Sequence, residues 1–260
     1  MEYWKSIPLF IIMIVIIICI IYYYKKSKAT KTRHMEPFEQ KDWLEELFDS
    51  RQIITIPSRR DNVSNFCKSL DINETIFSAI LKNDIKYDNP HNLKLGEIAC
   101  ALSQEQVLKN FTSSMHNSLL IFEDDIMPIN HKMYTDLETT QEHVKNYVKK
   151  AVEYLPTDWD VLYFGRCWDN CRRHTPVNKF LVKVHRTMCH HAIAFSRRGA
   201  QKILDNITHP FTKPIDHIVS GLCSNGTITC YATVVPVFYQ NREELFTTIG
   251  NFDKLPICMN

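Results

Sequence analysis

The sequence predicts an α/β fold with a mainly parallel sheet and helices on both faces, preceded by one N-terminal transmembrane helix. Short apolar runs of strand length alternate with longer helix-like segments, which is typical of this class. Several of these runs are apolar at consecutive positions, and such strands need helices on both sides of the sheet. The transmembrane helix is indicated by an uncharged stretch of 18 residues near the N-terminus.

That uncharged stretch, residues 7–24, is just long enough to cross the hydrocarbon core at about 1.5 Å per helical residue. It ends in three tyrosines and is followed by two lysines, whereas a cleaved signal peptide has a shorter apolar region followed by small residues. We therefore expect a membrane signal-anchor over residues 1–24, a basic stem over 25–38 and one folded domain over 39–260. A cleaved signal peptide or a buried core helix is the alternative for residues 7–24.

The charge is unevenly spread along the chain. The formal net charge is +2, and residues 1–33 carry +5 of it, which leaves −3 on the remainder. A nucleic-acid-binding domain should carry its basic excess on the folded part. Because the folded part carries a net negative charge, we do not expect the protein to bind nucleic acid.

Two signals disagree about which side of the membrane the domain faces. Positive charge after the span favours a cytosolic domain. Eight cysteines after the anchor and five N-x-[ST] sequons suit a glycoprotein in the lumen of the secretory pathway. We favour the lumen of the ER or Golgi, and a cytosol-facing domain stays open. The sequons are at Asn62, Asn73, Asn110, Asn206 and Asn225.

The elements are expected in the following order. Residues 40–50 have apolar side chains at helical spacing and predict a short amphipathic helix. Apolar or β-branched runs predict strands over residues 52–56, 118–122, 159–165, 191–195 and 230–239. Apolar periodicity predicts helices over residues 96–111, from about 134 to 155, and from a Ser196 cap to about 206.

An acidic triplet follows the strand expected at residues 118–122. Glu123, Asp124 and Asp125 repel one another unless water or a cation neutralises them. Ligands of open α/β sheets bind beyond the carboxyl ends of the strands, and hard divalent cations take carboxylate oxygens. A solvated turn is the alternative, but the apolar residues on both sides of the triplet favour a site.

Seven motifs occur in an order that resembles glycosyltransferase family 25, which includes lipopolysaccharide and collagen galactosyltransferases. They cover most of residues 52–241 and read "ITIPSRRDNV", "GEIACALSQ", "LLIFEDDI", "DWDVLYFGRC", "CHHAIAFSRRGAQKIL", "PID" and "PVFYQN". The first motif has Ile56-Pro57 where the family has leucine. Two single positions also depart from the family pattern. Gln104 stands where the family usually has histidine, and His190 stands where threonine or a small residue is usual.

The resemblance implies a GT-A-like fold, a nucleotide-sugar donor that is most often a UDP-sugar, a divalent metal and inversion at the anomeric carbon. Carboxylates can hold such a metal, which neutralises the leaving diphosphate; we expect Mn²⁺ rather than Mg²⁺. Asp125 is the expected metal ligand, and Glu123 or Asp124 is expected to assist it and to contact the donor. Asp216, in "PID", is the candidate catalytic base. Asp216 could instead be a helix cap or a turn residue.

Other candidates have equally open roles. Arg59 and Arg60 follow a strand and could bind the nucleotide or its phosphates, or they could be ordinary surface arginines. His191 matches the family's histidine and could contact metal or phosphate, or it could be a satisfied core residue. The cysteines near residue 170 lack the second pair of a zinc site. A disulfide joining Cys189 to Cys167 or to Cys171 is therefore expected instead of zinc.

The predicted function is that of a membrane-anchored hexosyltransferase. It would move galactose or glucose from the nucleotide sugar to a hydroxyl of a glycan or protein acceptor. The alternative is a non-catalytic descendant of the same fold that binds glycans or a partner. A binder has no need of the acidic triplet and Asp216, and both are present.

Overall fold

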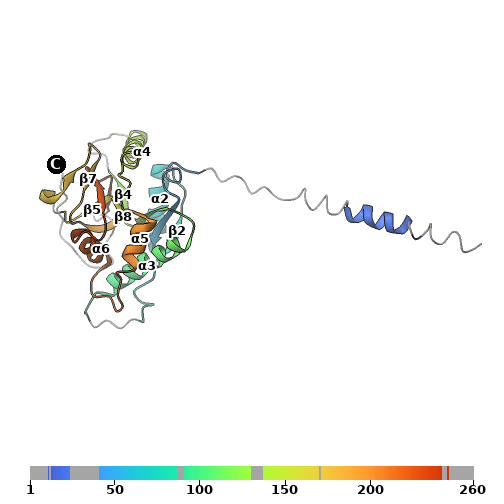
Figure 1. Cartoon of the computed structure of the whole chain (residues 1–260), viewed down its shortest axis with the longest axis horizontal. Coiled ribbons are helices and arrows are strands. Elements are labelled where there is room, and N and C mark those ends of the chain that lie inside the picture. The colour runs from blue at the N-terminus through green and yellow to red at the C-terminus, as the bar shows by residue number, and fades with distance from the viewer. Residues whose placement is uncertain are drawn as a thin grey trace, which may run out of the picture. The chain divides into compact units, whose positions relative to one another are not determined.

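The computed structural model describes residues 11, 13–23, 41–86, 91–129, 137–169, 171–241 and 245. The chain forms two compact units, residues 1–40 and 41–260. In the first unit, residues 13–23 are helical and their side chains are exposed (Figure 1). No helix within the described ranges is both long and apolar enough to cross a membrane. The expected anchor extends beyond those ranges at both ends, and the expected stem lies outside them.

The second unit is built on an eight-stranded sheet. Its strands lie in the order β2-β1-β3-β8-β5-β9-β7-β6. A separate pair joins β4 to β10 in antiparallel orientation. The strand bounds are β1 Ser50–Thr55, β2 Ile76–Ser78, β3 Ser118–Glu123, β4 Ile126–Pro128, β5 Val161–Cys167, β6 Thr175–Pro176, β7 Leu181–Lys183, β8 Met188–Ser196, β9 Cys230–Thr233 and β10 Phe238–Gln240.

Most strands of this sheet run in the same direction. β1 pairs in parallel with β2 and β3, and β5 pairs in parallel with β9. β8 lies between β3 and β5 and is antiparallel to both, so β3 and β5 point the same way. β7 is also reversed, since it is antiparallel to β9 and to β6. The predicted mainly parallel sheet is confirmed for strand direction, and the reversed β8 makes the sheet mixed.

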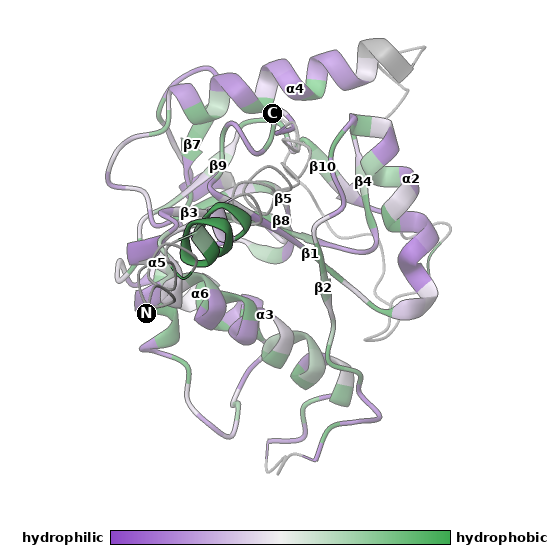
Figure 2. Ribbon diagram, turned by 90° about the vertical axis from the view of Figure 1, so that its right-hand side faces the viewer, coloured by the Kyte–Doolittle hydropathy of each residue, from purple (hydrophilic) through white to green (hydrophobic). Residues whose placement is uncertain are grey.

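Helices cover both faces of the sheet, as the apolar strands predict (Figure 2). On one face, α2 and α4 pack over β-strand side chains such as Leu120 and Phe122. On the other face, α3, α5 and α6 pack over the alternate side chains, such as Leu119 and Ile121. The helix bounds are η1 Pro57–Arg59, α2 Arg60–Leu70, α3 Leu95–Ser113, α4 Leu137–Glu153, η2 Cys171–Arg173, α5 Arg197–Leu204 and α6 Ile215–Ser224.

The predicted cap of α5 is confirmed. The Ser196 hydroxyl accepts a hydrogen bond from the Gly199 amide at 3.0 Å, which satisfies an amide that has no partner inside the helix.

The predicted helix over residues 40–50 is wrong. Residues 43–47 form turns, and the strand begins at Ser50. The Asp42 carboxylate accepts from the Leu44 and Glu45 amides, and the same side chain binds Arg51. These contacts fix a compact turn, while the apolar side chains that suggested a helix are buried against the sheet.

The predicted single strand over residues 230–239 is two strands. β9 ends at Thr233, and β10 begins at Phe238. Pro236 has no amide hydrogen to donate to a ladder, so it interrupts the strand. The chain crosses there from the large sheet to the β4–β10 pair, and this places Gln240 beside the acidic triplet.

Candidate active site

One edge of the sheet gathers most of the predicted site residues. β1 and β3 are parallel and in register, with Ile54 opposite Glu123, so both strands end there. β5 ends at the same edge, where Cys167 pairs with Met188 at the start of β8. A cleft of about 650 Å³ opens there, lined by the ends of these strands, the loop after β2, α3 and the beginning of α6.

Asp124 ties the end of β3 to the loop after β1. Its Oδ1 accepts from Arg59 Nη1 at 2.7 Å, and its Oδ2 accepts from the Ile56 amide at 2.9 Å. Its main-chain carbonyl accepts from Asn62 Nδ2 at 2.6 Å. Asp124 therefore borders the cleft with both carboxylate oxygens engaged, and it fixes the loop that carries Arg59.

Asp125 is a second buried carboxylate that lines the cleft. Gln240 Nε2 lies 3.3 Å from its Oδ2, and Arg59 Nη1 lies 3.8 Å from the same oxygen. The Asn241 amide donates to its main-chain carbonyl at 2.6 Å. These contacts hold Asp125 in place from β10 and from the loop after β1.

Glu123 lies in the same cleft and is crowded by negative charge. Its Oε1 accepts from Gln104 Nε2 at 3.2 Å and from the Cys100 thiol at 3.8 Å. Burial, followed by repulsion from Asp125 and the other nearby carboxylates, raises the pKa of Glu123 to about 8. A cation in the cleft would relieve this repulsion.

Gln104 and His190, the two single residues that depart from the family pattern, contact each other. The Gln104 Oε1 and His190 Nδ1 atoms lie 2.8 Å apart, and both residues are buried in the cleft wall. Because an amide oxygen only accepts, this orientation of Gln104 makes Nδ1 the protonated nitrogen of His190. Burial lowers the pKa of His190 to about 4, so its imidazole is neutral near pH 7. Gln104 thus bridges His190 and Glu123.

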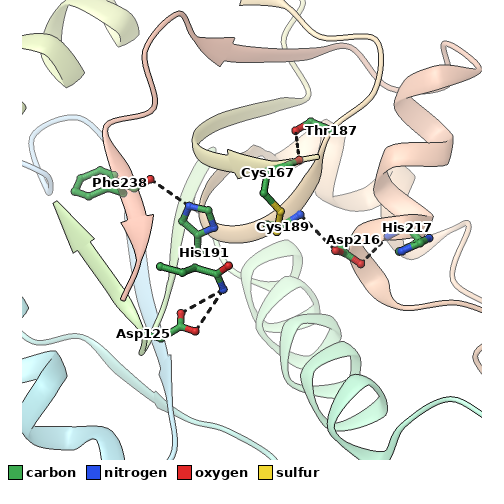
Figure 3. The surroundings of a disulfide bond; sticks show 9 residues. Asp125, Cys167, Thr187, Cys189, His191, Asp216, His217 and Phe238 are labelled. Carbon is green, nitrogen blue, oxygen red and sulfur yellow. Dashed lines mark hydrogen bonds between the residues drawn. A yellow bond between two sulfur atoms is a disulfide. The ribbon is translucent and has the colours of Figure 1, made fainter. Parts of the chain in front are cut away.

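Asp216 lies in the first turn of α6, which also lines the cleft. The residue preceding the helix is Pro214, so Asp216 is not its N-cap. Its Oδ2 accepts from the Cys189 amide at 3.3 Å, and its Oδ1 accepts from the His217 amide at 2.9 Å (Figure 3). Both contacts orient the carboxylate at the cleft.

A disulfide supports this part of the cleft. Cys167 and Cys189 are bonded, with Cα atoms 5.6 Å apart, and this resolves the two predicted pairings in favour of Cys167. The Thr187 hydroxyl donates to the Cys167 carbonyl at 3.1 Å (Figure 3). The bond joins β5 to β8 directly behind the amide that binds Asp216.

Two predicted residues lie away from the cleft lining. Arg60 is exposed, and its Nη2 lies 3.4 Å from the Ser78 hydroxyl. His191 is buried, with Nε2 3.1 Å from the Phe238 carbonyl, and it packs over Gly165. The structure therefore brings Arg59, the acidic triplet and Asp216 together at the cleft, and it places Arg60 and His191 outside it.

Sequence reasoning did not assign site roles to Gln104, His190, Gln240 or Trp168, which all line the cleft. The sequence did mark Gln104 and His190, because both depart from the family pattern. Trp168 directly follows a cysteine of the disulfide, which is a weak signal.

Whether the cleft could bind a metal ion depends on which side chains in it can act as ligands. Among the described residues, no three His, Cys, Asp or Glu side chains form a ready-made metal site. Glu123 and Asp125 both line the cleft, however, and nucleotide-bound divalent cations are commonly held by one or two carboxylates together with substrate phosphates. The residues present fit a cation whose coordination is completed by a diphosphate.

The cleft thus places Glu123 and Asp125 at the carboxyl edge of the sheet of an α/β domain. The family model described as "Glycosyltransferase family 25 (LPS biosynthesis protein)" matches residues 50–219. The chain belongs to glycosyltransferase family 25, and its domain is a glycosyltransferase domain.

The chain also matches solved structures at low sequence identity. Protein A197 from STIV is 15% identical with a TM-score of 0.39, over 81% of this chain and 97% of that one. A mutant of the Drosophila β-1,4-galactosyltransferase 7, in complex with manganese, UDP-Gal and xylobiose, is 9% identical with a TM-score of 0.36, over 79% and 77%. UDP-glucose pyrophosphorylase with UDP-glucose is 11% identical with a TM-score of 0.36, over 71% and 72%. No curated protein matches the chain.

Proposed function

We propose that the protein is a metal-dependent hexosyltransferase that moves galactose or glucose from a UDP-sugar to an acceptor hydroxyl with inversion. The observation that carries the proposal is the convergence of Glu123, Asp125 and Asp216 on one cleft, the first two from the end of β3 and the third from α6. A non-catalytic binder would have no use for a carboxylate pair facing a third carboxylate.

Each residue has a distinct role in this proposal. Asp125, with Glu123, holds a divalent cation, Mn²⁺ rather than Mg²⁺, which neutralises charge on the diphosphate. Arg59 lies beside Asp125 and adds positive charge near the phosphates. Asp216 accepts the proton of the acceptor hydroxyl, and the Cys189 and His217 amides keep its carboxylate oriented for this step.

The decisive experiment measures nucleotide release by the full-length chain from each common nucleotide sugar, with and without Mn²⁺. Asp125→Asn keeps the side-chain volume and removes one ligand charge, so metal-dependent turnover should fall by a factor on the order of 100 or more. The thermal unfolding temperature of the metal-free protein should stay level or rise, because a repulsion is relieved.

The control is Asp205→Asn, at an exposed carboxylate after α5 whose partner is Gln201. It should change neither quantity. Wild-type metal-dependent turnover by Asp125→Asn, or outright unfolding of that variant, would show that the carboxylates are structural.

We also propose that residues 1–24 anchor the protein in a membrane and that residues 25–38 form a stem. The uncharged run and its flanking tyrosines and lysines support this. The intact protein should stay with membranes through alkaline carbonate extraction. Its recovery in the soluble fraction would refute the anchor.

A further inference from the structure

An aromatic side chain stands exposed at the rim of the cleft. Trp168 lines the cleft and is 54% exposed, although a large indole is usually at least half covered in a folded protein. The family assignment gives this residue no role. Its neighbours in sequence are the disulfide-bonded Cys167 and the buried Asp169.

The backbone of Trp168 is held in a conformation that bulky residues avoid. Its φ is +50°, in the left-handed region that favours glycine and asparagine. Such a conformation persists where the surrounding structure determines it, and this happens most often at functional sites.

Contacts hold the residue on each side of Trp168. The Cys167–Cys189 bond fixes the residue before it. On the other side, the Asp169 carboxylate accepts from Arg166 Nε at 2.6 Å, and Arg166 is itself buried and donates to the Thr233 carbonyl at 2.6 Å. A fixed support that presents an exposed ring in an unfavourable conformation indicates that the ring contacts a ligand.

The position of the ring indicates which ligand. The disulfide links the Trp168 loop to Cys189, whose amide holds Asp216, the proposed base. Arg59 and Asp125, the proposed diphosphate side, belong to other elements of the cleft. The ring therefore lies on the side where the acceptor hydroxyl must meet its base.

Resting on the proposed function, we propose that Trp168 is a stacking platform for the acceptor and that the acceptor is a glycan. A pyranose ring presents a face of C–H bonds, whose weakly positive hydrogens complement the negative face of an indole. Arg186 and His217 are exposed on the same cleft and supply hydrogen bonds to sugar hydroxyls.

The test compares Trp168→Leu and Trp168→Phe in the full-length chain, with UDP-galactose or UDP-glucose, Mn²⁺ and p-nitrophenyl pyranosides as acceptors. Trp168→Leu keeps an apolar side chain but loses the flat ring, so the acceptor KM should rise on the order of tenfold, and more than the donor KM. Trp168→Phe should recover most of the loss. Tyr154→Leu, at an exposed aromatic residue outside the cleft, is the matched control and should leave both KM values unchanged.

Trp168→Gly separates a ligand role from a structural one. Glycine relieves the left-handed backbone, so the thermal unfolding temperature should not fall while pyranoside use is lost. A large fall in the unfolding temperature would mean that the ring is structural and would overturn the proposal. An unchanged acceptor KM in Trp168→Leu, or transfer to peptide hydroxyls but not to pyranosides, would also overturn it.

A binding measurement keeps this inference distinct from the proposed function. If the wild type releases no nucleotide from any donor, the proposed function fails. Saturation-transfer NMR with methyl β-D-galactopyranoside and methyl β-D-glucopyranoside then decides the stacking surface by itself. Saturation that is present in the wild type and lost in Trp168→Leu supports it, and equal signals in both proteins overturn it.

Discussion

Glu123 shows how a single carboxyl can make the stability of the metal-free protein depend on pH. Its pKa in the folded protein, about 8, lies above the ordinary value of 4.5. The folded state therefore binds the Glu123 proton more tightly than the unfolded chain does. This contribution to stability is fully present below about pH 4.5 and is lost as the pH rises to about 8.

We therefore expect Glu123→Gln, which stays neutral, to become more stable than the wild type as the pH increases. In EDTA, the difference in unfolding temperature should grow between pH 5 and 8 to on the order of 10 °C and then level off. Glu74→Gln, at an exposed glutamate, should follow the wild-type curve. Parallel curves for Glu123→Gln and the wild type would contradict the assigned pKa.

A second residue-scale prediction concerns the Gln104 bridge. Gln104→Ala removes the contacts to His190 and Glu123 together, and it should destabilise the protein by about 1–3 kcal/mol because a buried imidazole loses its partner. His190→Ala removes one of the same hydrogen bonds. The double variant should therefore be less destabilised than the sum of the two single variants, as a denaturation cycle would measure.

Gln106→Ala is the control for this cycle, because Gln106 lies on the same helix and its amide reaches only the exposed Asn110. Strict additivity of Gln104→Ala and His190→Ala would show that the two side chains do not act as a unit.

At this scale, the sequence predicted which carboxylates gather but not how each is used. The adjacency of Glu123, Asp124 and Asp125 indicated a charged site, and all three line the cleft. Asp124 accepts a hydrogen bond from the Ile56 amide, which is 68 residues away in the sequence. No local sequence pattern predicts this contact. The exclusion of His191 from the cleft likewise depends on the distant Phe238 carbonyl.

At the scale of elements, we expect replacement by alanine to have opposite effects on stability at Gly165 and at Gly221. A Cβ at Gly165 in β5 would collide with the His191 ring and would lie 2.8 Å from the Phe238 carbonyl. Gly165→Ala should therefore destabilise by about 1–3 kcal/mol and lower activity, since it displaces β10 and with it Gln240. A Cβ at Gly221 in α6 meets nothing within 4 Å.

Gly221→Ala is thus the matched control, and it should stabilise the protein by about 0.5–1 kcal/mol because alanine favours the helix. Urea denaturation of both variants gives the comparison. A Gly165→Ala protein as stable as the wild type would mean that β5 and β10 approach less closely than described.

The elements themselves were predictable where one physical signal dominated. The uninterrupted apolar run gave β3, and the serine cap gave the start of α5. The segment at 43–47 was misassigned because its apolar spacing suits a helix, whereas the Asp42 carboxylate and Arg51 stabilise a turn. The antiparallel placement of β8 was not predictable, since its apolar sequence fits either direction.

At the scale of the whole molecule, the side of the membrane can be decided by which sequons carry glycans. Asn62 and Asn73 are partly buried, and their side-chain amides donate to Asp124 and Glu45. Asn110, Asn206 and Asn225 are exposed. If the domain is lumenal as proposed, glycans should occupy the exposed three and not the other two.

Endoglycosidase treatment should then shift the electrophoretic mobility, and replacing the three exposed asparagines by glutamine should abolish the shift. Modification at Asn62 would contradict the described loop, because Asn62 is partly buried and its Nδ2 lies 2.6 Å from the Asp124 carbonyl, which leaves little room for a glycan. No shift, together with protease access from the cytosol, would favour the positive-inside signal.

The position of β8 also constrains the order in which the domain can assemble during synthesis. β3 and β5 emerge from the ribosome before residues 188–196, yet they touch only through that later strand. Until it arrives, the β2-β1-β3 part of the sheet ends in an apolar strand with unpaired backbone groups. β5 has no partner strand at all at that point, since β9 is synthesised after β8. Such edges are where nascent chains aggregate. A ribosome that stalls between β5 and β8 would therefore leave the outer edge of β3 and both edges of β5 unpaired, so this is an interval in which chaperone protection matters.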